Sequence, residues 1–82
     1  MTEATILEGL RAIAKTHLSY DGDMVMDAPL VETLKLDSIR MLTLIVEVEN
    51  HFEICLEEDD ESSIETLQDL IVVVRRLTDG RR

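Results

Sequence analysis

Hydrophobic residues recur with the period of an α-helix in three segments of the chain. Over residues 2–18 the apolar face consists of Ile6, Leu10, Ile13, Ala14 and either His17 or Leu18. Over residues 38–52 it consists of Ile39, Leu42, Ile45, Val46 and Phe52. From residue 67 onward an uninterrupted i, i+3, i+4 stripe is formed by Leu67, Leu70, Ile71, Val74 and Leu77. The pattern predicts three amphipathic helices that share one core.

Residues that favour helix N-termini stand at the start of each segment. Thr2 is a suitable cap for the first helix, and Asp37 and Ser38 both suit the start of the second. Thr66 precedes the third segment, and Asp69 follows it at the spacing of a capping box. Local chemistry therefore agrees with the periodicity on where each helix begins.

The first connection, residues 19–37, is long and contains a glycine, a proline and several aspartates. A structureless loop of this length is unusual in a small domain unless it is pinned or functional. Leu30, Leu34 and Leu36 are the residues that could pin it to the core. We expect a single helical turn over residues 30–34.

The second connection begins with Ile54 and Leu56, whose alternation predicts a short extended link. Cys55 lies between them and is expected to be a small buried hydrophobe. The acidic run at 57–61 has two equally weighted interpretations, a solvated segment or a segment that contacts a partner. It lacks the ligand spacing and central glycine of an EF-hand, so we predict no metal site. One short helical turn is expected at residues 62–64.

Together these elements predict an all-α fold, a small four-helix bundle with three main helices and one short one. The chain has 82 residues, so we expect a single domain over 1–82. With one Tyr, one Phe and no Trp, its core must be aliphatic. A domain of this size leaves little room for a deep catalytic pocket.

The formal net charge of −10 excludes some classes of partner. A strongly acidic chain repels nucleic-acid phosphates and anionic lipid headgroups, so neither nucleic acid nor membrane is expected as a partner. The N-terminus lacks the basic start and apolar run of a signal peptide, and no apolar stretch approaches the ~20 residues of a membrane span. The single cysteine suits a reducing compartment. We expect a soluble, cytoplasmic monomer.

The most informative segment is Leu-Lys-Leu-Asp-Ser-Ile at residues 34–39. It resembles the attachment site of acyl and peptidyl carrier proteins, whose usual pattern is Leu-Gly-x-Asp-Ser-Leu. The resemblance extends in spacing from Leu30 to Leu77. Further positions that fit the family are Pro29, Phe52, Ile64, Thr66 and Leu67.

This resemblance implies that a phosphopantetheinyl transferase attaches 4'-phosphopantetheine from coenzyme A to Ser38. Asp37 would help position the transferase and its metal-bound coenzyme A. The arm would carry acyl or aminoacyl cargo as a thioester, and the chain itself would not be a catalyst. The implied partners are an acyl- or aminoacyl-loading ligase or acyltransferase and a ketosynthase or other biosynthetic enzyme. A phosphodiester also suits the free N–H groups of a helix N-terminus.

Two departures from the family pattern matter. Lys35 stands where the family usually has glycine. If the backbone needs a positive φ there, lysine is strained at this position and glycine is not. After Ser38 come Arg40, Met41 and Thr43, where the family often carries acidic residues for docking basic partners. We therefore expect a dedicated partner set from a specialised polyketide, nonribosomal peptide or modified fatty-acid pathway. The expected partner-binding residues are Ile39, Arg40, Met41, Val46, Glu47, Glu49 and Glu53; for Met41 and Val46, partial burial in the core is an open alternative.

An enzyme and an adaptor are the two alternatives to a carrier. As an enzyme, the chain would use Ser38 as a nucleophile, but His51 lies at the far end of the same predicted helix, roughly 20 Å away. As a non-catalytic acidic helical adaptor, it would bind a basic partner and Ser38 would be only a helix cap. The adaptor hypothesis explains the size and charge, but leaves the Asp-Ser-Ile arrangement as coincidence.

Overall fold

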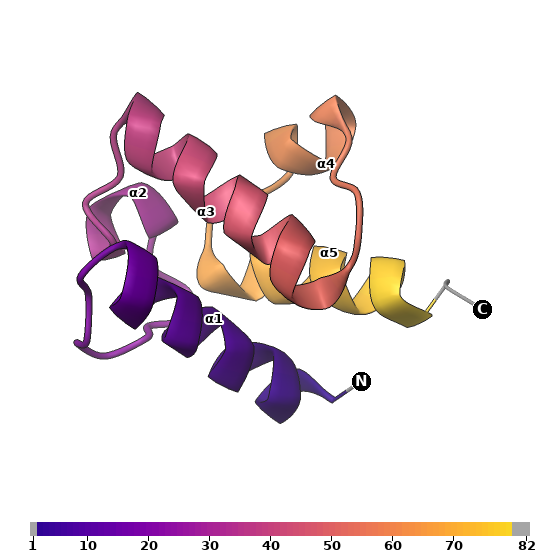
Figure 1. The fold of residues 1–82 in the computed structure, drawn as a ribbon, viewed down its shortest axis with the longest axis horizontal. Helices are drawn as coiled ribbons and strands as arrows, with labels where there is room; N and C mark the ends of the chain where they lie inside the picture. The colour runs from indigo at the N-terminus through magenta and orange to yellow at the C-terminus, as the bar shows by residue number, and fades with distance from the viewer. Residues whose placement is uncertain (1, 80–82) are drawn as a thin grey trace.

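The computed structural model describes residues 2–79, which form five helices and no strand. The three long helices are α1 (Glu3–His17), α3 (Ser38–Phe52) and α5 (Leu67–Asp79), and the two short ones are α2 (Leu30–Thr33) and α4 (Glu58–Ser62) (Figure 1). The predicted all-α fold is confirmed. The structure has two short helices, whereas the predicted bundle has one. None of the helices within residues 2–79 is long and apolar enough to cross a bilayer.

The helix starts follow the predicted capping chemistry. The Thr2 side chain caps α1 by accepting a hydrogen bond from the Thr5 N–H at 3.2 Å. At α5 the Asp69 N–H donates to Thr66 Oγ1 at 3.2 Å, and the Thr66 N–H donates to the Asp69 carboxylate at 3.1 Å. The Glu65 N–H donates to the same carboxylate. These reciprocal bonds satisfy N–H groups that the helix itself cannot pair.

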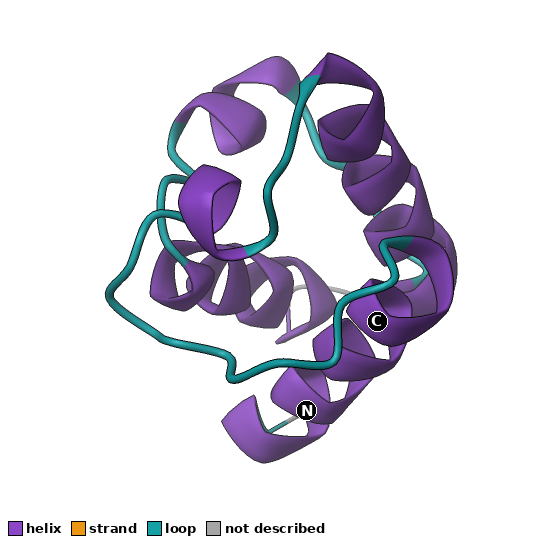
Figure 2. Ribbon diagram, turned by 90° about the vertical axis from the view of Figure 1, so that its left-hand side faces the viewer, coloured by secondary structure: helices purple, strands orange, loops and turns teal. Residues whose placement is uncertain are grey.

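One hydrophobic core lies between the long helices and includes the connection between α1 and α3. Figure 2 shows that most of this connection is loop, with α2 as its only helix. Leu30, Leu34 and Leu36 are all buried, as predicted. The backbone is also tied to the start of α5, because the Leu30 N–H donates to the Glu65 carbonyl at 2.8 Å. The long loop is therefore pinned at the end that leads into α3.

The predicted core face of α3 was partly wrong. Ile45 and Phe52 are buried, but Ile39, Leu42 and Val46 are 76%, 64% and 40% exposed. The buried positions that the periodicity missed are Leu44 and Val48. This helix is apolar on two sides, so spacing alone could not decide which side packs against α1 and α5.

The acidic run was expected to be a solvated or partner-contacting segment with a short helical turn after it at residues 62–64, whereas the helix α4 spans Glu58–Ser62. The Glu57 N–H donates to the Asp60 carboxylate at 3.2 Å in a capping box. Asp60 also pairs with Arg76 of α5. Acidic side chains in the first turn of a helix are stabilised by its dipole, which explains why this charge run can be helical.

The expectation that Cys55 is buried was also wrong, because the thiol residue is exposed. Its neighbours Ile54 and Leu56 are partly and fully buried, respectively. In an extended link successive side chains point to opposite sides, so the residue between two inward-facing neighbours must face outward.

Candidate functional site

Ser38, the predicted attachment residue, is the first residue of the 15-residue helix α3. It is exposed, and its hydroxyl makes no hydrogen bond with any of residues 2–79. The cap of the helix is Asp37, whose Oδ1 accepts a hydrogen bond from the Arg40 N–H at 2.8 Å. Ser38 is therefore not the N-cap, and its hydroxyl is left free for chemistry.

The backbone before Ser38 is held by buried leucines and a tight turn. The Leu34 N–H donates to the Leu30 carbonyl and the Leu36 N–H to the Val31 carbonyl, both at 2.9 Å. Lys35, between the two leucines, has φ 51°. This is the left-handed region, where a side chain is strained and glycine is favoured. The turn thus has the conformation that would make the usual glycine of the family pattern favourable at this position.

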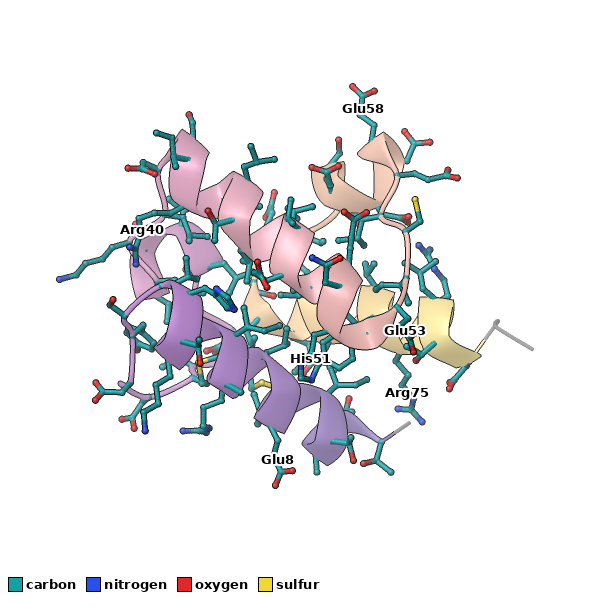
Figure 3. All side chains as sticks on the ribbon, viewed as in Figure 1. Glu8, Arg40, His51, Glu53, Glu58 and Arg75 are labelled. Atoms are coloured by element: carbon teal, nitrogen blue, oxygen red, sulfur yellow. The ribbon has the colours of Figure 1, made fainter. Side chains whose placement is uncertain are left out.

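Arg40 was expected on a partner surface, but its partly buried side chain reaches from α3 toward the ends of α1 and α2 (Figure 3). One terminal nitrogen donates to the Leu18 carbonyl at 2.5 Å and lies 3.4 Å from the Leu34 carbonyl. The guanidinium therefore joins the end of α1 and the end of α2 to the first turn of α3. Its Nε is buried and has no hydrogen-bond partner among the described residues.

The acidic residues predicted to bind partners lie in three different environments. Glu47 pairs with His17 of α1, with a distance of 3.1 Å between Oε1 and Nε2. The Glu49 carboxylate accepts a hydrogen bond from the Leu56 N–H at 2.8 Å and so holds the link to α4. Glu53 is exposed at the end of α3, in a left-handed conformation with φ 55°. Two of the three carboxylates therefore have roles inside the fold.

The exposed side of α3 is apolar. Ile39, Leu42 and Val46 follow one another along this side, and we call them the α3 apolar stripe. Met41, in contrast, is partly buried and packs against the core. Sequence reasoning missed Leu42 as a surface residue. The signal that could have found it is the i, i+3, i+7 spacing of the stripe, separate from the buried positions of the same helix.

Neither histidine is placed to activate Ser38. His17 is paired with Glu47, and His51 lies in the last turn of α3 with its ring 4.7 Å from that of Phe52. Figure 3 shows His51 beside α1, where a Cβ added to Gly9 would come within 2.8 Å of its Nε2. A groove of about 260 Å³ between α1 and α3 has both histidines in its lining, but not Ser38. Neither imidazole is therefore placed to be the base that a nucleophilic Ser38 would need.

Comparisons with known proteins agree with the geometry at the start of α3. The family described as "Phosphopantetheine attachment site" matches residues 8–73. The chain belongs to this family. Domains of the phosphopantetheine attachment family are sites of covalent 4'-phosphopantetheine attachment, which confirms the predicted cofactor.

Relatives within the family are named acyl carrier proteins. The acyl carrier protein of Onion yellows phytoplasma (strain OY-M) is 31% identical over 74 residues, covering 89% of this chain and 97% of the relative. That of Thermosynechococcus vestitus is 31% identical over 72 residues, covering 87% and 89%. A solved structure from Mycobacterium tuberculosis, described as an acyl carrier protein, has a TM-score of 0.71 and 28% identity, covering 90% and 95%. The chain is therefore a member of the acyl carrier protein family.

The start of α3 fits the phosphopantetheine group of this family. The exposed Ser38 hydroxyl offers an oxygen for a phosphodiester bond. The first N–H groups of a helix have no intrahelical acceptor and carry the positive end of the dipole, so they favour a phosphate. No residue between 2 and 79 covers this oxygen with a hydrogen bond.

Proposed function

We propose that this chain carries acyl or aminoacyl groups as thioesters on a phosphopantetheine arm attached to Ser38. The observation that carries the proposal is that two different residues cap α3 and offer the free hydroxyl at its start. Asp37 performs the capping, and the Ser38 hydroxyl remains exposed and unbonded. When bound, the arm supplies the thiol that carries the cargo, while the chain supplies the attachment oxygen and the docking surface.

The other serines support the choice of Ser38. Ser62 donates to the Glu58 carbonyl at 3.0 Å and Ser63 donates to the Asp60 carbonyl at 2.8 Å, so both hydroxyls serve α4. Ser19 lies in the loop after α1, with φ 53°. Neither setting combines a free hydroxyl with the first turn of a long helix. Ser38 is the serine for which attachment is expected.

The partner surface we propose is the α3 apolar stripe together with Glu53. Ile39 directly follows the attachment serine, so an enzyme that reaches the arm also meets this side of the helix. Glu47 and Glu49 border the surface but contribute to folding as well. Arg40 is not retained as a partner residue because its guanidinium is engaged inside the fold. Asp37 remains the residue proposed to help position the transferase.

The loss of acidic residues early in α3 favours a dedicated set of partners. We propose that a phosphopantetheinyl transferase, a loading ligase or acyltransferase, and a ketosynthase or similar enzyme act on this carrier in the cytoplasm. A pathway for polyketides, nonribosomal peptides or modified fatty acids fits a helix that has Arg40, Met41 and Thr43 where the family often carries acidic residues.

The test is the intact mass of the protein after incubation with coenzyme A, Mg²⁺ and a broad-specificity phosphopantetheinyl transferase. We expect one phosphopantetheine increment, absent in Ser38→Ala and retained in Ser19→Ala. No increment with this enzyme or with the cognate transferase, under conditions that modify a control carrier, would contradict the proposal. The acidic adaptor would then be the better hypothesis, and it predicts that Ser38→Ala binds its partner as well as the wild type.

A further inference from the structure

We propose that the Lys35 ammonium group pairs with the phosphodiester at Ser38 and holds the base of the arm. This inference rests on the proposed attachment at Ser38. It assigns a binding role to the residue that stands in place of the usual glycine.

The backbone turn sets Lys35 apart from the two leucines beside it. Leu34 and Leu36 on either side of it are buried, and both donate backbone hydrogen bonds to α2. Lys35 between them is exposed and has φ 51°. A strained residue of this kind persists only where the surrounding structure imposes it, and such strain is often found at functional sites. The turn therefore leaves the lysine side chain exposed to solvent three residues before the attachment serine.

Charge makes this lysine the natural partner of the phosphate. Between residues 16 and 74, Lys35 and Arg40 are the only Lys or Arg residues. The Arg40 guanidinium is occupied by the carbonyls of Leu18 and Leu34. Lys35 makes no ion pair or side-chain hydrogen bond with residues 2–79. It is the remaining long cation near Ser38.

The carboxylate of Asp37 adds a further reason for a cation at this place. Asp37 is adjacent to Ser38, and its cap bond to the Arg40 N–H holds the carboxylate at the start of α3. A phosphodiester at Ser38 would add a second negative charge beside it. A cation at residue 35 offsets this repulsion.

The distance is within reach of the lysine. Three residues of extended chain span at most about 10 Å, and the turn at Lys35 shortens the separation from Ser38. The flexible four-carbon stem of lysine and the Ser38–phosphate linkage together cover such a separation.

Lysine footprinting tests the pair, because the chain contains only Lys15 and Lys35. Lys15 is exposed on α1 and serves as the internal reference. The apo protein and the phosphopantetheine-modified protein are treated with an amine-acylating reagent, and acylation at each lysine is followed by mass spectrometry. We expect Lys35 acylation to slow about two- to fourfold on modification at low salt, relative to Lys15, as for an exposed ion pair. The protection should disappear at high salt.

The phosphorus resonance of the modified protein provides an independent readout. We expect the ³¹P shift of the phosphodiester to be retained in Lys35→Arg and displaced in Lys35→Met. An unchanged Lys35-to-Lys15 reactivity ratio, protection that persists at high salt, or identical ³¹P shifts in all three proteins would overturn the inference while leaving attachment intact. If Ser38 accepts no phosphopantetheine at all, the proposed function fails and this inference fails with it.

Discussion

The two apolar sides of α3 have similar residues and opposite roles. On the inner side, Leu44 and Val48 are buried against the core. On the outer side, Ile39 and Leu42 are exposed in the stripe that starts beside Ser38. Leucines two positions apart therefore differ in exposure from 2% to 64%. Apolar residues on this helix therefore have two different roles, packing on the inner side and proposed docking on the outer side.

The largest expected effect comes from truncating each leucine in turn. Leu44→Ala should lower the free energy of unfolding by about 2–4 kcal/mol, because it removes a buried side chain and leaves a cavity. Leu42→Ala should lower it by less than about 0.5 kcal/mol, because that side chain is already in water. Urea denaturation midpoints measure both. Equal losses would contradict the assignment of the two sides.

The same pair separates packing from docking when transferase kinetics are measured. Leu42→Ala should lower the kcat/KM of the transferase for this carrier about five- to tenfold, as expected for the loss of an apolar contact at an interface. The control is an exposed valine on another helix, Val72→Ala of α5, which should leave the rate unchanged. A stripe variant that is modified at the wild-type rate would remove the stripe from the transferase surface.

Arg40 lies between the two sides of α3 and joins the first turn to two carbonyls. Arg40→Met should cost about 1.5–3 kcal/mol, the range for hydrogen bonds made by charged groups. Arg40→Lys, with a single ammonium, should recover part of this loss. A Met variant as stable as the wild type would mean that burying the guanidinium with an unpaired Nε cancels the gain from its bonds.

Asp37 and Thr66 cap α3 and α5 and provide a matched pair. Asp37→Ala and Thr66→Ala should each cost about 1 kcal/mol of stability, the usual loss for a helix cap. Only Asp37→Ala should also slow phosphopantetheine attachment. Asp37→Asn keeps a capping oxygen without the charge, so it should restore stability but not the attachment rate. Equal attachment rates in all four proteins would limit Asp37 to capping.

The start of α5 should also carry a pH dependence. Backbone N–H groups of Glu65 and Thr66, in that order, hold the pKa of the Asp69 carboxyl below its ordinary value. A lowered pKa in the folded state contributes stability above the ordinary value, and that contribution is lost as the pH falls through the folded pKa. Asp69→Asn should therefore reduce the acid sensitivity of stability. Urea midpoints of the wild type and of Asp69→Asn, measured from neutral to acidic pH, test this prediction. If the two midpoints fall in parallel as the pH is lowered, the prediction is wrong.

A small effect of the opposite sign is expected at Lys35. Lys35→Gly should raise stability by about 0.5–1 kcal/mol, because relief of left-handed strain exceeds the added freedom of the unfolded chain. Lys35→Ala keeps the Cβ and should bring no such gain. A Gly variant that is less stable than wild type would mean that the turn is not strained.

Much of the fold could be predicted because helix boundaries depend on local chemistry. Thr2, Asp37 and Thr66 are followed by helices as expected, and α3 has the predicted bounds of 38–52. The buried loop leucines were also evident, since a long connection in a small domain needs anchors. The resemblance that pointed to Ser38 is likewise local, because it is carried by consecutive residues at a helix start.

The errors share a physical cause, which is that they concern the direction of side chains relative to the rest of the fold. Spacing could not choose between the two apolar sides of α3, because both have helical periodicity. Charge could not reveal that Arg40 reaches the carbonyls of Leu18 and Leu34, because those residues are distant along the chain. Nor could composition show that Cys55 faces solvent.

By itself, the sequence determined the starts of the three long helices, the acidic charge and the Asp37–Ser38 pair, because each depends on neighbouring residues. The tertiary structure decided which side of α3 is buried, that Asp37 rather than Ser38 is the cap, and that Arg40 is held inside. Those outcomes depend on which groups from distant segments come into contact. A one-dimensional pattern does not contain that information, whereas packing around a single small core does.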